Sequence, residues 1–144
     1  MIFYRELKKY KYQLMDDYTI DIDLHPAEDI IEPPMPRAAY LRLDTSGKLS
    51  INRSYAWDGP SGPAIDTKNF MRGSLVHDAL YQLMRRGRIG QNCRELADDL
   101  LRDICREDGM SYFRSWYVHK AVRLFAAAAA RQSDEDEYRI LTAP

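Results

Sequence analysis

The sequence has 144 residues, 45% hydrophobic and 30% charged, and this balance suits one ordinary domain with a buried core. Its 21 Lys and Arg residues offset its 22 Asp and Glu residues, so the net charge is −1. We expect no general attraction to nucleic acid or to an anionic membrane, although a local basic patch stays open. No apolar run reaches the roughly 18 residues of a membrane-spanning helix, and residues 1–6 become charged at once, unlike a secretory signal. We therefore expect a cytoplasmic protein with no transmembrane segment.

The two cysteines are not expected to form a disulfide. Cys93 and Cys105 lie in one predicted helical stretch, where their separation is about 18 Å at 1.5 Å per residue. That distance is far beyond the reach of a disulfide bridge. We expect both to be small buried hydrophobic residues.

The first half of the chain predicts a small antiparallel sheet. Apolar and polar residues alternate strictly over residues 18–24, which is the period of a half-buried strand. Residues 10–14 are a weaker strand candidate. Residues 25–37 contain four prolines, and we expect a loop there without ladder hydrogen bonds.

Residues 39–44 and 49–57 predict a hairpin. Thr45, Ser46 and Gly47 supply its turn, because Gly47 adopts positive φ without steric cost. A loop rich in glycine and proline, residues 57–63, then separates the two halves of the chain.

The second half predicts helices. The first ends near Arg86 and starts either after Thr67 or after Ser74, each a suitable N-cap. Gly73 argues against the earlier start, because glycine weakens a helix interior. Val76, Leu80 and Leu83 form the expected core stripe, and both starts stay open.

Two further helices are expected over residues 91–107 and 111–131. Aromatic and aliphatic residues make the third helix strongly apolar: Phe113, Trp116, Tyr117, Val122, Leu124 and Phe125. Residues 133–144 are acidic, and we expect a flexible, solvated tail after a single domain of residues 1–132. A sheet followed by an antiparallel helical hairpin and a third helix predicts the α+β class.

The predicted hairpin of helices brings a histidine and a carboxylate together. Residues 87–90 make a short connection, so the first two helices are expected to be antiparallel neighbours. His77 lies about ten residues before this connection and Asp98 about eight after it, which favours a hydrogen bond between them. Such a pair is a general base and the group that orients it. Tyr81 lies one turn after His77 and is expected to reach the second helix.

Asp78 is expected to point elsewhere. Adjacent residues of a helix diverge by about 100°, so while His77 faces the partner helix, Asp78 faces the preceding loop. Its carboxylate and the loop carbonyls are oxygen donors of the kind that calcium binds.

Less specific interpretations stay open. Asp98 has Arg94 and Arg102 four residues away on either side, which is an ordinary surface pairing. A transition-metal site built from His77, Asp78 and Asp98 is a weaker option. We expect His25 and His119 to be ordinary surface residues.

Four elements between residues 39 and 125 resemble the family called domain of unknown function 1353. They are Tyr-Ala-Trp-Asp-Gly-Pro-Ser-Gly-Pro at residues 55–63, Leu-Val-His-Asp-Ala-Leu-Tyr at 75–81, Ala-Asp at 97–98 and Ala-Val-Arg-Leu-Phe at 121–125. Pro60 and Trp57 depart from the residues usual in that family. The resemblance implies a phage or prophage protein without a settled activity, with the virion as an alternative location to the cytoplasm.

The His-Asp-x-x-Tyr pattern, followed by Ala-Asp, is also similar to calcium-dependent phospholipases of the secreted and parvoviral type. This resemblance implies that His77 is the general base, that Asp98 orients it, and that Tyr81 supports Asp98. It further implies that Asp78 holds calcium together with carbonyls of the loop, at Trp57, Gly59 and Gly62. The chain lacks the disulfides of the secreted enzymes, and its loop has fewer glycines.

Two functions are therefore carried forward. The first is a metal-dependent hydrolase of phospholipid or another ester, with calcium as cofactor. The second is a non-catalytic phage accessory protein that contacts a host or phage protein, with a purely structural His-Asp cluster.

Overall fold

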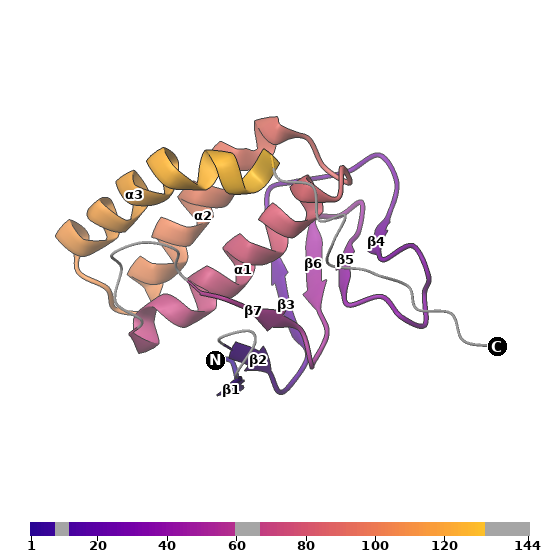
Figure 1. Cartoon of the computed structure of the whole chain (residues 1–144), viewed down its shortest axis with the longest axis horizontal. Helices are drawn as coiled ribbons and strands as arrows, with labels where there is room; N and C mark the ends of the chain where they lie inside the picture. Colours follow the sequence, from indigo (N-terminus) through magenta and orange to yellow (C-terminus); the bar gives the residue numbers. More distant parts are fainter. Residues whose placement is uncertain (8–11, 60–66, 132–144) are drawn as a thin grey trace.

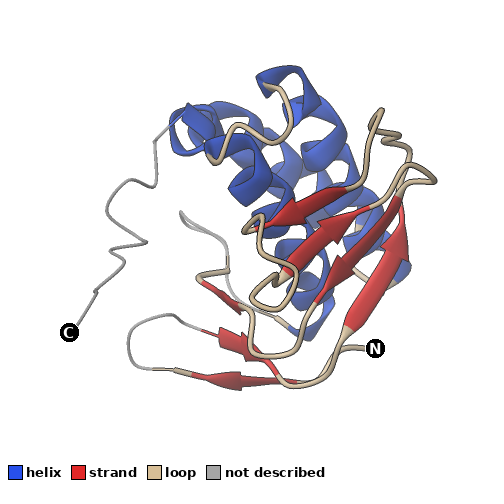
Figure 2. Ribbon diagram, turned by 90° about the vertical axis from the view of Figure 1, so that its right-hand side faces the viewer, coloured by secondary structure: helices blue, strands red, loops and turns tan. Residues whose placement is uncertain are grey.

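The computed structural model describes residues 1–7, 12–59 and 67–131, with side chains up to Leu124. The described chain is α+β: two antiparallel sheets in its N-terminal part precede three α-helices (Figure 1). In Figure 2 the helices lie together on one side of the strands. The expected tail of residues 133–144 lies outside the described residues.

Each sheet is built from very short strands. The first sheet has the order β1-β2-β7, and the second has the order β3-β6-β5-β4. The strands of the first sheet are β1 (Tyr4–Glu6), β2 (Tyr12–Leu14) and β7 (Ala56–Trp57). Those of the second are β3 (Tyr18–Asp21), β4 (Ile30–Glu32), β5 (Leu41–Leu43) and β6 (Lys48–Ile51).

The hairpin of β5 and β6 confirms the sequence prediction. Asp44 Oδ1 accepts hydrogen bonds from the backbone N–H groups of Ser46 and Lys48, at 2.9 and 3.0 Å, and Gly47 has φ +89°. Alternate side chains of the two strands point into the core, where none of them is exposed: Leu41, Leu43, Leu49 and Ile51. The hairpin thus supplies the apolar surface against which the helices pack.

Two expectations for the strands are wrong. Residues 49–57 do not form one strand, because the chain turns at Ser54, which has φ +76°, and leaves the second sheet to enter the first as β7. The second wrong expectation concerns the proline-rich segment of residues 25–37, which does contain ladder hydrogen bonds. The strand β4 lies within it, between Pro26 and Pro33, and pairs with β5. Ile30 and Glu32 are buried there. The strand β1 was not expected, whereas β2 confirms the weaker candidate.

The helix α1 (Lys68–Arg85) is the centre of the molecule. It begins after Thr67, so the earlier of the two expected starts is confirmed. Gly73 does not interrupt this helix, and its lack of a side chain serves packing. A Cβ at this position would lie 2.9 Å from Cys105 Sγ and 3.0 Å from Leu101 Cδ1. The glycine therefore allows α1 and the next helix to approach closely.

The other helices complete the layer. A short 3₁₀ turn, η1 (Gln91–Cys93), leads into α2 (Arg94–Glu107), which runs antiparallel to α1 as expected (Figure 1). The third helix, α3 (Tyr112–Arg131), follows Ser111, whose Oγ accepts a hydrogen bond of 3.2 Å from the backbone of Arg114. Both cysteines are free; Cys105 is buried as expected, whereas the expected burial of Cys93 is wrong, because it lies in the η1 turn and is partly exposed. In the portion of the chain described, no helix combines the length and the hydropathy that crossing a bilayer requires.

Candidate functional site

The helical hairpin brings His77 of α1 against Asp98 of α2. The Nε2 atom of His77 lies 2.8 Å from Asp98 Oδ1, which confirms the expected contact. The side chain of Asp98 has no exposed surface, and that of His77 is only 9% exposed. Because an ionised carboxylate only accepts hydrogen bonds, Nε2 carries the hydrogen and donates it to Asp98.

Asp98 is held by three side chains from two helices. The hydroxyl of Tyr81 donates a hydrogen bond to the same Oδ1 at 2.7 Å, and Arg123 Nη1 of α3 donates to Oδ2 at 3.2 Å. Burial alone raises the pKa of Asp98, but the hydrogen bonds from His77 and Tyr81 outweigh it, and the pKa lies below its usual value. A buried anion with this many donors keeps its charge.

The alternative interpretation, in which Asp98 forms surface ion pairs with Arg94 and Arg102, is therefore wrong. Arg102 instead pairs with Asp103 at 3.0 Å and lies 3.6 Å from Asp99. Asp98 points away from the exposed side of α2 and into the contact with α1 and α3.

The other ring nitrogen of His77 faces Asp78. His77 Nδ1 lies 3.7 Å from Asp78 Oδ1, which is longer than a hydrogen bond. The side chains of His77 and Asp78 were expected to point in different directions. This expectation is only half right, since the Asp78 carboxylate lies near the His77 ring. Burial lowers the pKa of His77, but Asp78 and Asp98 act in the opposite direction and leave that pKa raised. The two nitrogens thus see different surroundings: a fully buried carboxylate and one whose side chain is 26% exposed.

Trp57 fixes the end of β7 to α1. The buried indole Nε1 of Trp57 donates a hydrogen bond to Ser74 Oγ at 3.1 Å, and Ser74 lies one turn before Asp78. Burial raises the pKa of Asp78 against the opposing effect of His77, and the negative charge of the neighbouring Asp58 raises it further. Of the predicted loop, the structure shows Asp58 near enough to affect Asp78, a residue to which the sequence analysis gave no role.

The predicted calcium ligands are described only in part. Trp57 belongs to the core through its side chain, and Gly59 is buried with φ +74°. Gly62 lies outside the described residues. Asp78 and the neighbouring Asp58 offer carboxylate oxygens, the donor type that calcium prefers, but the described residues hold no group of three His, Cys, Asp or Glu side chains arranged around a metal ion.

A transition-metal centre finds no support in the described parts of the chain. They hold no group of three or more His, Cys, Asp and Glu side chains that is arranged to bind a metal ion. Asp98 and Asp78 contact opposite nitrogens of the His77 ring, so the three residues do not converge on one point.

Arg123 and His119 of α3 have roles that the sequence reasoning missed. Arg123 stands in the Ala-Val-Arg element, which is the signal that was available for it. His119 is not an ordinary surface residue, because its side chain is 15% exposed and its Nε2 lies 2.7 Å from Asp99 Oδ1. His25, by contrast, is exposed as expected, 3.3 Å from Asp23.

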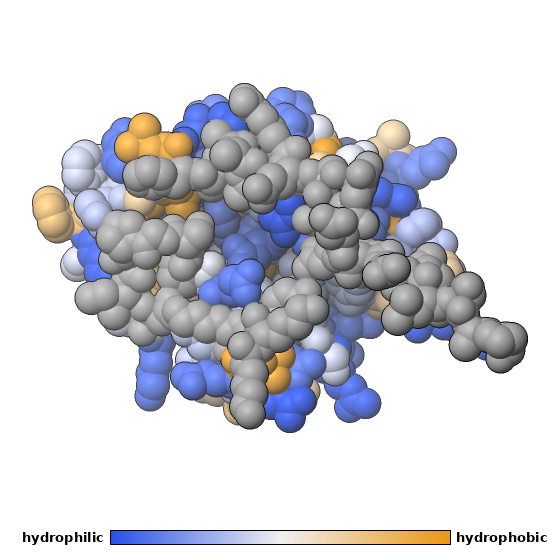
Figure 3. Space-filling model, viewed as in Figure 1, coloured by the Kyte–Doolittle hydropathy of each residue, from blue (hydrophilic) through white to orange (hydrophobic). Residues whose placement is uncertain are grey.

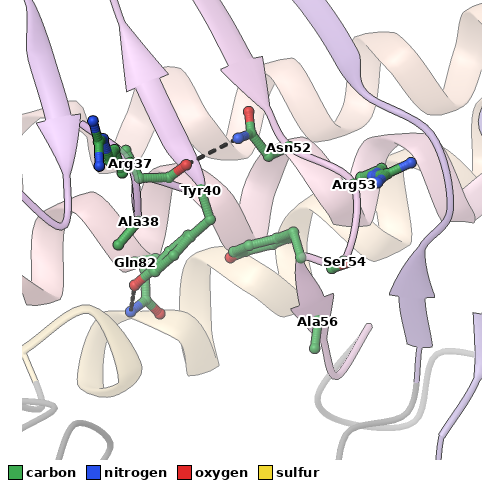
Figure 4. Close-up of a pocket in the computed structure, with 10 residues that line it drawn as sticks. Arg37, Ala38, Tyr40, Asn52, Arg53, Ser54, Ala56 and Gln82 are labelled. Carbon is green, nitrogen blue, oxygen red and sulfur yellow. Dashed lines mark hydrogen bonds between the residues drawn. The ribbon is translucent and has the colours of Figure 1, made fainter. Parts of the chain in front are cut away.

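A separate hollow of about 410 Å³ is lined by the segment before β5, the segment from Asn52 to Ala56 after β6, and Gln82 of α1 (Figure 4). Tyr40 and Tyr55 belong to its lining with ring centroids 5.7 Å apart, and Gln82 Nε2 donates a hydrogen bond to the Tyr40 hydroxyl at 3.5 Å. Its lining does not include His77, Asp78 or Asp98. The hollow is therefore distinct from the histidine site.

Comparisons with known proteins add no relative to these observations. No protein-family model matches the chain, and neither a curated protein nor a solved structure matches it. The resemblances to domain of unknown function 1353 and to calcium-dependent phospholipases therefore stay predictions that rest on the motifs themselves.

Proposed function

We propose that this protein is a calcium-dependent hydrolase of lipid esters in which His77 is the general base. The observation that carries the proposal is that the two ring nitrogens of His77 have different surroundings. Nε2 donates to the buried Asp98, which fixes the tautomer, and this leaves Nδ1 as the acceptor on the side of Asp78. A base oriented in this way by a carboxylate is the arrangement that activates water.

The proposed reaction consumes one water molecule and one ester. His77 Nδ1 takes a proton from the water as its oxygen bonds to the ester carbonyl carbon. The resulting oxyanion then collapses, the bond to the alcohol oxygen breaks, and His77 returns its proton to that oxygen. The products are a carboxylic acid and an alcohol, and Asp98 stabilises the transient imidazolium.

Asp78 and Asp58 are the residues that would hold the cation. Their oxygen chemistry fits calcium, and burial together with the negative charge of Asp58 raises the pKa of Asp78. When bound, calcium supplies positive charge for the ester carbonyl oxygen. Tyr81 has the positioning role, because it holds Asp98 in place beside His77.

Release of fatty acid from mixed phospholipid vesicles tests the reaction. We expect calcium-dependent release that His77→Gln lowers by about 100-fold or more, the scale of a lost general base. His119→Gln is the matched control, because His119 also pairs with an aspartate but takes no part in the His77–Asp98 pair. Equal rates in the wild type and His77→Gln, with both proteins folded, would refute the proposal.

A second candidate function is a non-catalytic phage accessory protein. The observation in its favour is that Asp98 binds Tyr81 and His77 of α1 and Arg123 of α3, so the cluster ties three helices together. It predicts that His77→Gln lowers the melting temperature while calcium leaves the wild type unchanged. The hydrolase instead predicts that calcium raises the melting temperature of the wild type and not that of Asp78→Ala.

The source and location follow from the motif resemblance in this proposal. We infer a phage or prophage gene and a protein that acts in the cytoplasm of the producing cell, with the virion as the alternative. A host or phage protein is the expected partner if the accessory function holds.

A further inference from the structure

The hollow lined by Tyr40, Tyr55 and Gln82, here named the tyrosine hollow, brings two aromatic rings together. Tyr55 is 8% exposed, Tyr40 is half-buried, and the planes of their rings are tilted by 32°. On the face of the molecule drawn in Figure 3, the described residues are mostly hydrophilic, and the apolar ones appear in small separate groups. The two neighbouring rings therefore offer a local apolar surface on which a planar ligand can stack.

Hydrogen bonds hold the tyrosine hollow in shape. Asn52 joins two of its walls, because its backbone N–H donates to Tyr40 O and its Nδ2 donates to Ala39 O, each at 2.9 Å. The buried Gln82 contacts the Tyr40 hydroxyl from α1. Ser54, which also lines the hollow, has φ +76°, a strained conformation that clusters at ligand sites. The hollow is thus largely preformed, and its 410 Å³ falls within the range of about 300–1,000 Å³ of small-molecule sites.

The charge at the tyrosine hollow is positive. Its lining includes Arg37 and Arg53 and no acidic side chain. Among the residues that the structure describes, neither guanidinium has an ion-pair or hydrogen-bond partner. The carboxylate of Asp17 lies nearby, but it accepts a hydrogen bond of 2.7 Å from the backbone N–H of Arg53. Figure 4 shows Arg37 and Arg53 on opposite sides of Tyr40. An anionic group of a ligand therefore finds a cation on either side of the rings.

We propose that the tyrosine hollow binds a small ligand that joins a planar ring to an anionic group, the chemistry of a nucleoside monophosphate. The ring stacks on Tyr40 and Tyr55. The phosphate receives charge-assisted hydrogen bonds from a guanidinium, whose planar fork matches phosphate oxygens. The inference goes beyond the proposed hydrolysis and does not depend on it, because the lining excludes His77.

Isothermal titration calorimetry with adenosine monophosphate tests the ligand class. We expect one saturable site, and we expect adenosine and inorganic phosphate each to bind at least about tenfold more weakly, because each carries only one of the two recognised groups. No saturable binding of adenosine monophosphate up to about 1 mM overturns the proposal. Equal affinity for inorganic phosphate alone or for adenosine alone overturns it as well.

Substitution of the two exposed arginines locates the binding site. We expect Arg37→Gln combined with Arg53→Gln to weaken binding of adenosine monophosphate by about tenfold or more, the scale of lost charge-assisted hydrogen bonds. Lys48→Gln combined with Lys120→Gln is the matched control, because it removes the same charge at two exposed positions outside the lining. Equal affinity of the arginine variant and the lysine variant overturns the proposal.

The variant His77→Gln separates this outcome from that of the proposed hydrolysis. We expect it to bind adenosine monophosphate as the wild type does, whether or not the wild type cleaves lipid. Binding that is lost in folded His77→Gln places the ligand at the histidine site and overturns the proposal. Binding retained by a protein that cleaves no ester keeps the tyrosine hollow as a ligand site and refutes the hydrolase alone.

Discussion

Glu32 is a carboxylic acid enclosed by protein, only 5% exposed, at the end of β4. The guanidinium groups of Arg86 and Arg88 lie 3.8 and 3.9 Å from its oxygens, too far for tight hydrogen bonds. Burial raises the pKa of Glu32 above its ordinary 4.5, and the two arginines offset this only in part. The folded protein therefore favours the protonated form more strongly than the unfolded chain does.

This environment predicts a pH dependence of stability. As the pH rises from 4.5 through the higher pKa of the folded state, the unfolded chain loses its proton first and the free energy of unfolding falls. Glu32→Gln removes that loss. The free energy of unfolding of the variant therefore rises relative to that of the wild type as the pH rises through this window. Urea titrations across the window measure the difference, with the exposed Glu28→Gln as control. Parallel pH profiles for the wild type and Glu32→Gln would contradict the assignment.

Tyr81 allows a second test at the scale of one residue. Its hydroxyl donates to Asp98, and burial together with that negative charge raises the pKa of Tyr81 strongly. Tyr81→Phe removes one donor and leaves those from His77 and Arg123, so we expect a loss of about 1 kcal/mol in the free energy of unfolding. Chemical denaturation measures it. Tyr112→Phe, at a position 73% exposed, should leave stability unchanged.

At the scale of elements, the contact of α1 with α2 depends on one glycine. Gly73 lies against Cys105 Sγ and Leu101, so an alanine there has no room, although alanine favours a helix. We expect Gly73→Ala to lower the free energy of unfolding by about 1–3 kcal/mol, the usual cost of overpacking. Adding Cys105→Ala should recover part of this loss, since the small side chain removes the closest contact. If the two substitutions change the free energy of unfolding additively, the contact with Cys105 is not the cause of the loss in Gly73→Ala.

The same scale shows which elements the sequence predicts. The three helices and the β5–β6 hairpin follow from local signals: apolar periodicity, caps and the turn at Gly47. The strand β4 escapes prediction because it lies inside the proline-rich segment, which favours a loop, and β1 because its three residues, Tyr-Arg-Glu, are too few to show an alternating pattern. The contact of Arg123 with Asp98 escapes it as well, because the packing of α3 on α2 brings these residues together from 25 positions apart.

At the scale of the whole molecule, burial is uneven. Most of α1 is buried between the strands and the other helices, including Leu75, Val76 and Ala79, none of which is exposed. The strand β1 has only three residues, and two of them are exposed. The free energy of local opening is therefore expected to be highest in α1 and lowest in the first sheet.

Amide hydrogen exchange measures this gradient. We expect the slowest exchange in the middle of α1, at free energies close to that of global unfolding, and the fastest in β1. The site then rests on a rigid base, since His77 and Tyr81 both belong to α1. Comparable protection in β1 and α1 would contradict this order.

The buried thiol of Cys105 gives the helical pair a chemical consequence. Burial raises its pKa to about 12, so almost none of it is thiolate at neutral pH, and Gly73 covers it closely. Alkylating and oxidising agents are thereby limited to Cys93 while α1 and α2 stay together. The second sulfur becomes reactive only when the two helices part, which makes it a native reporter of that separation.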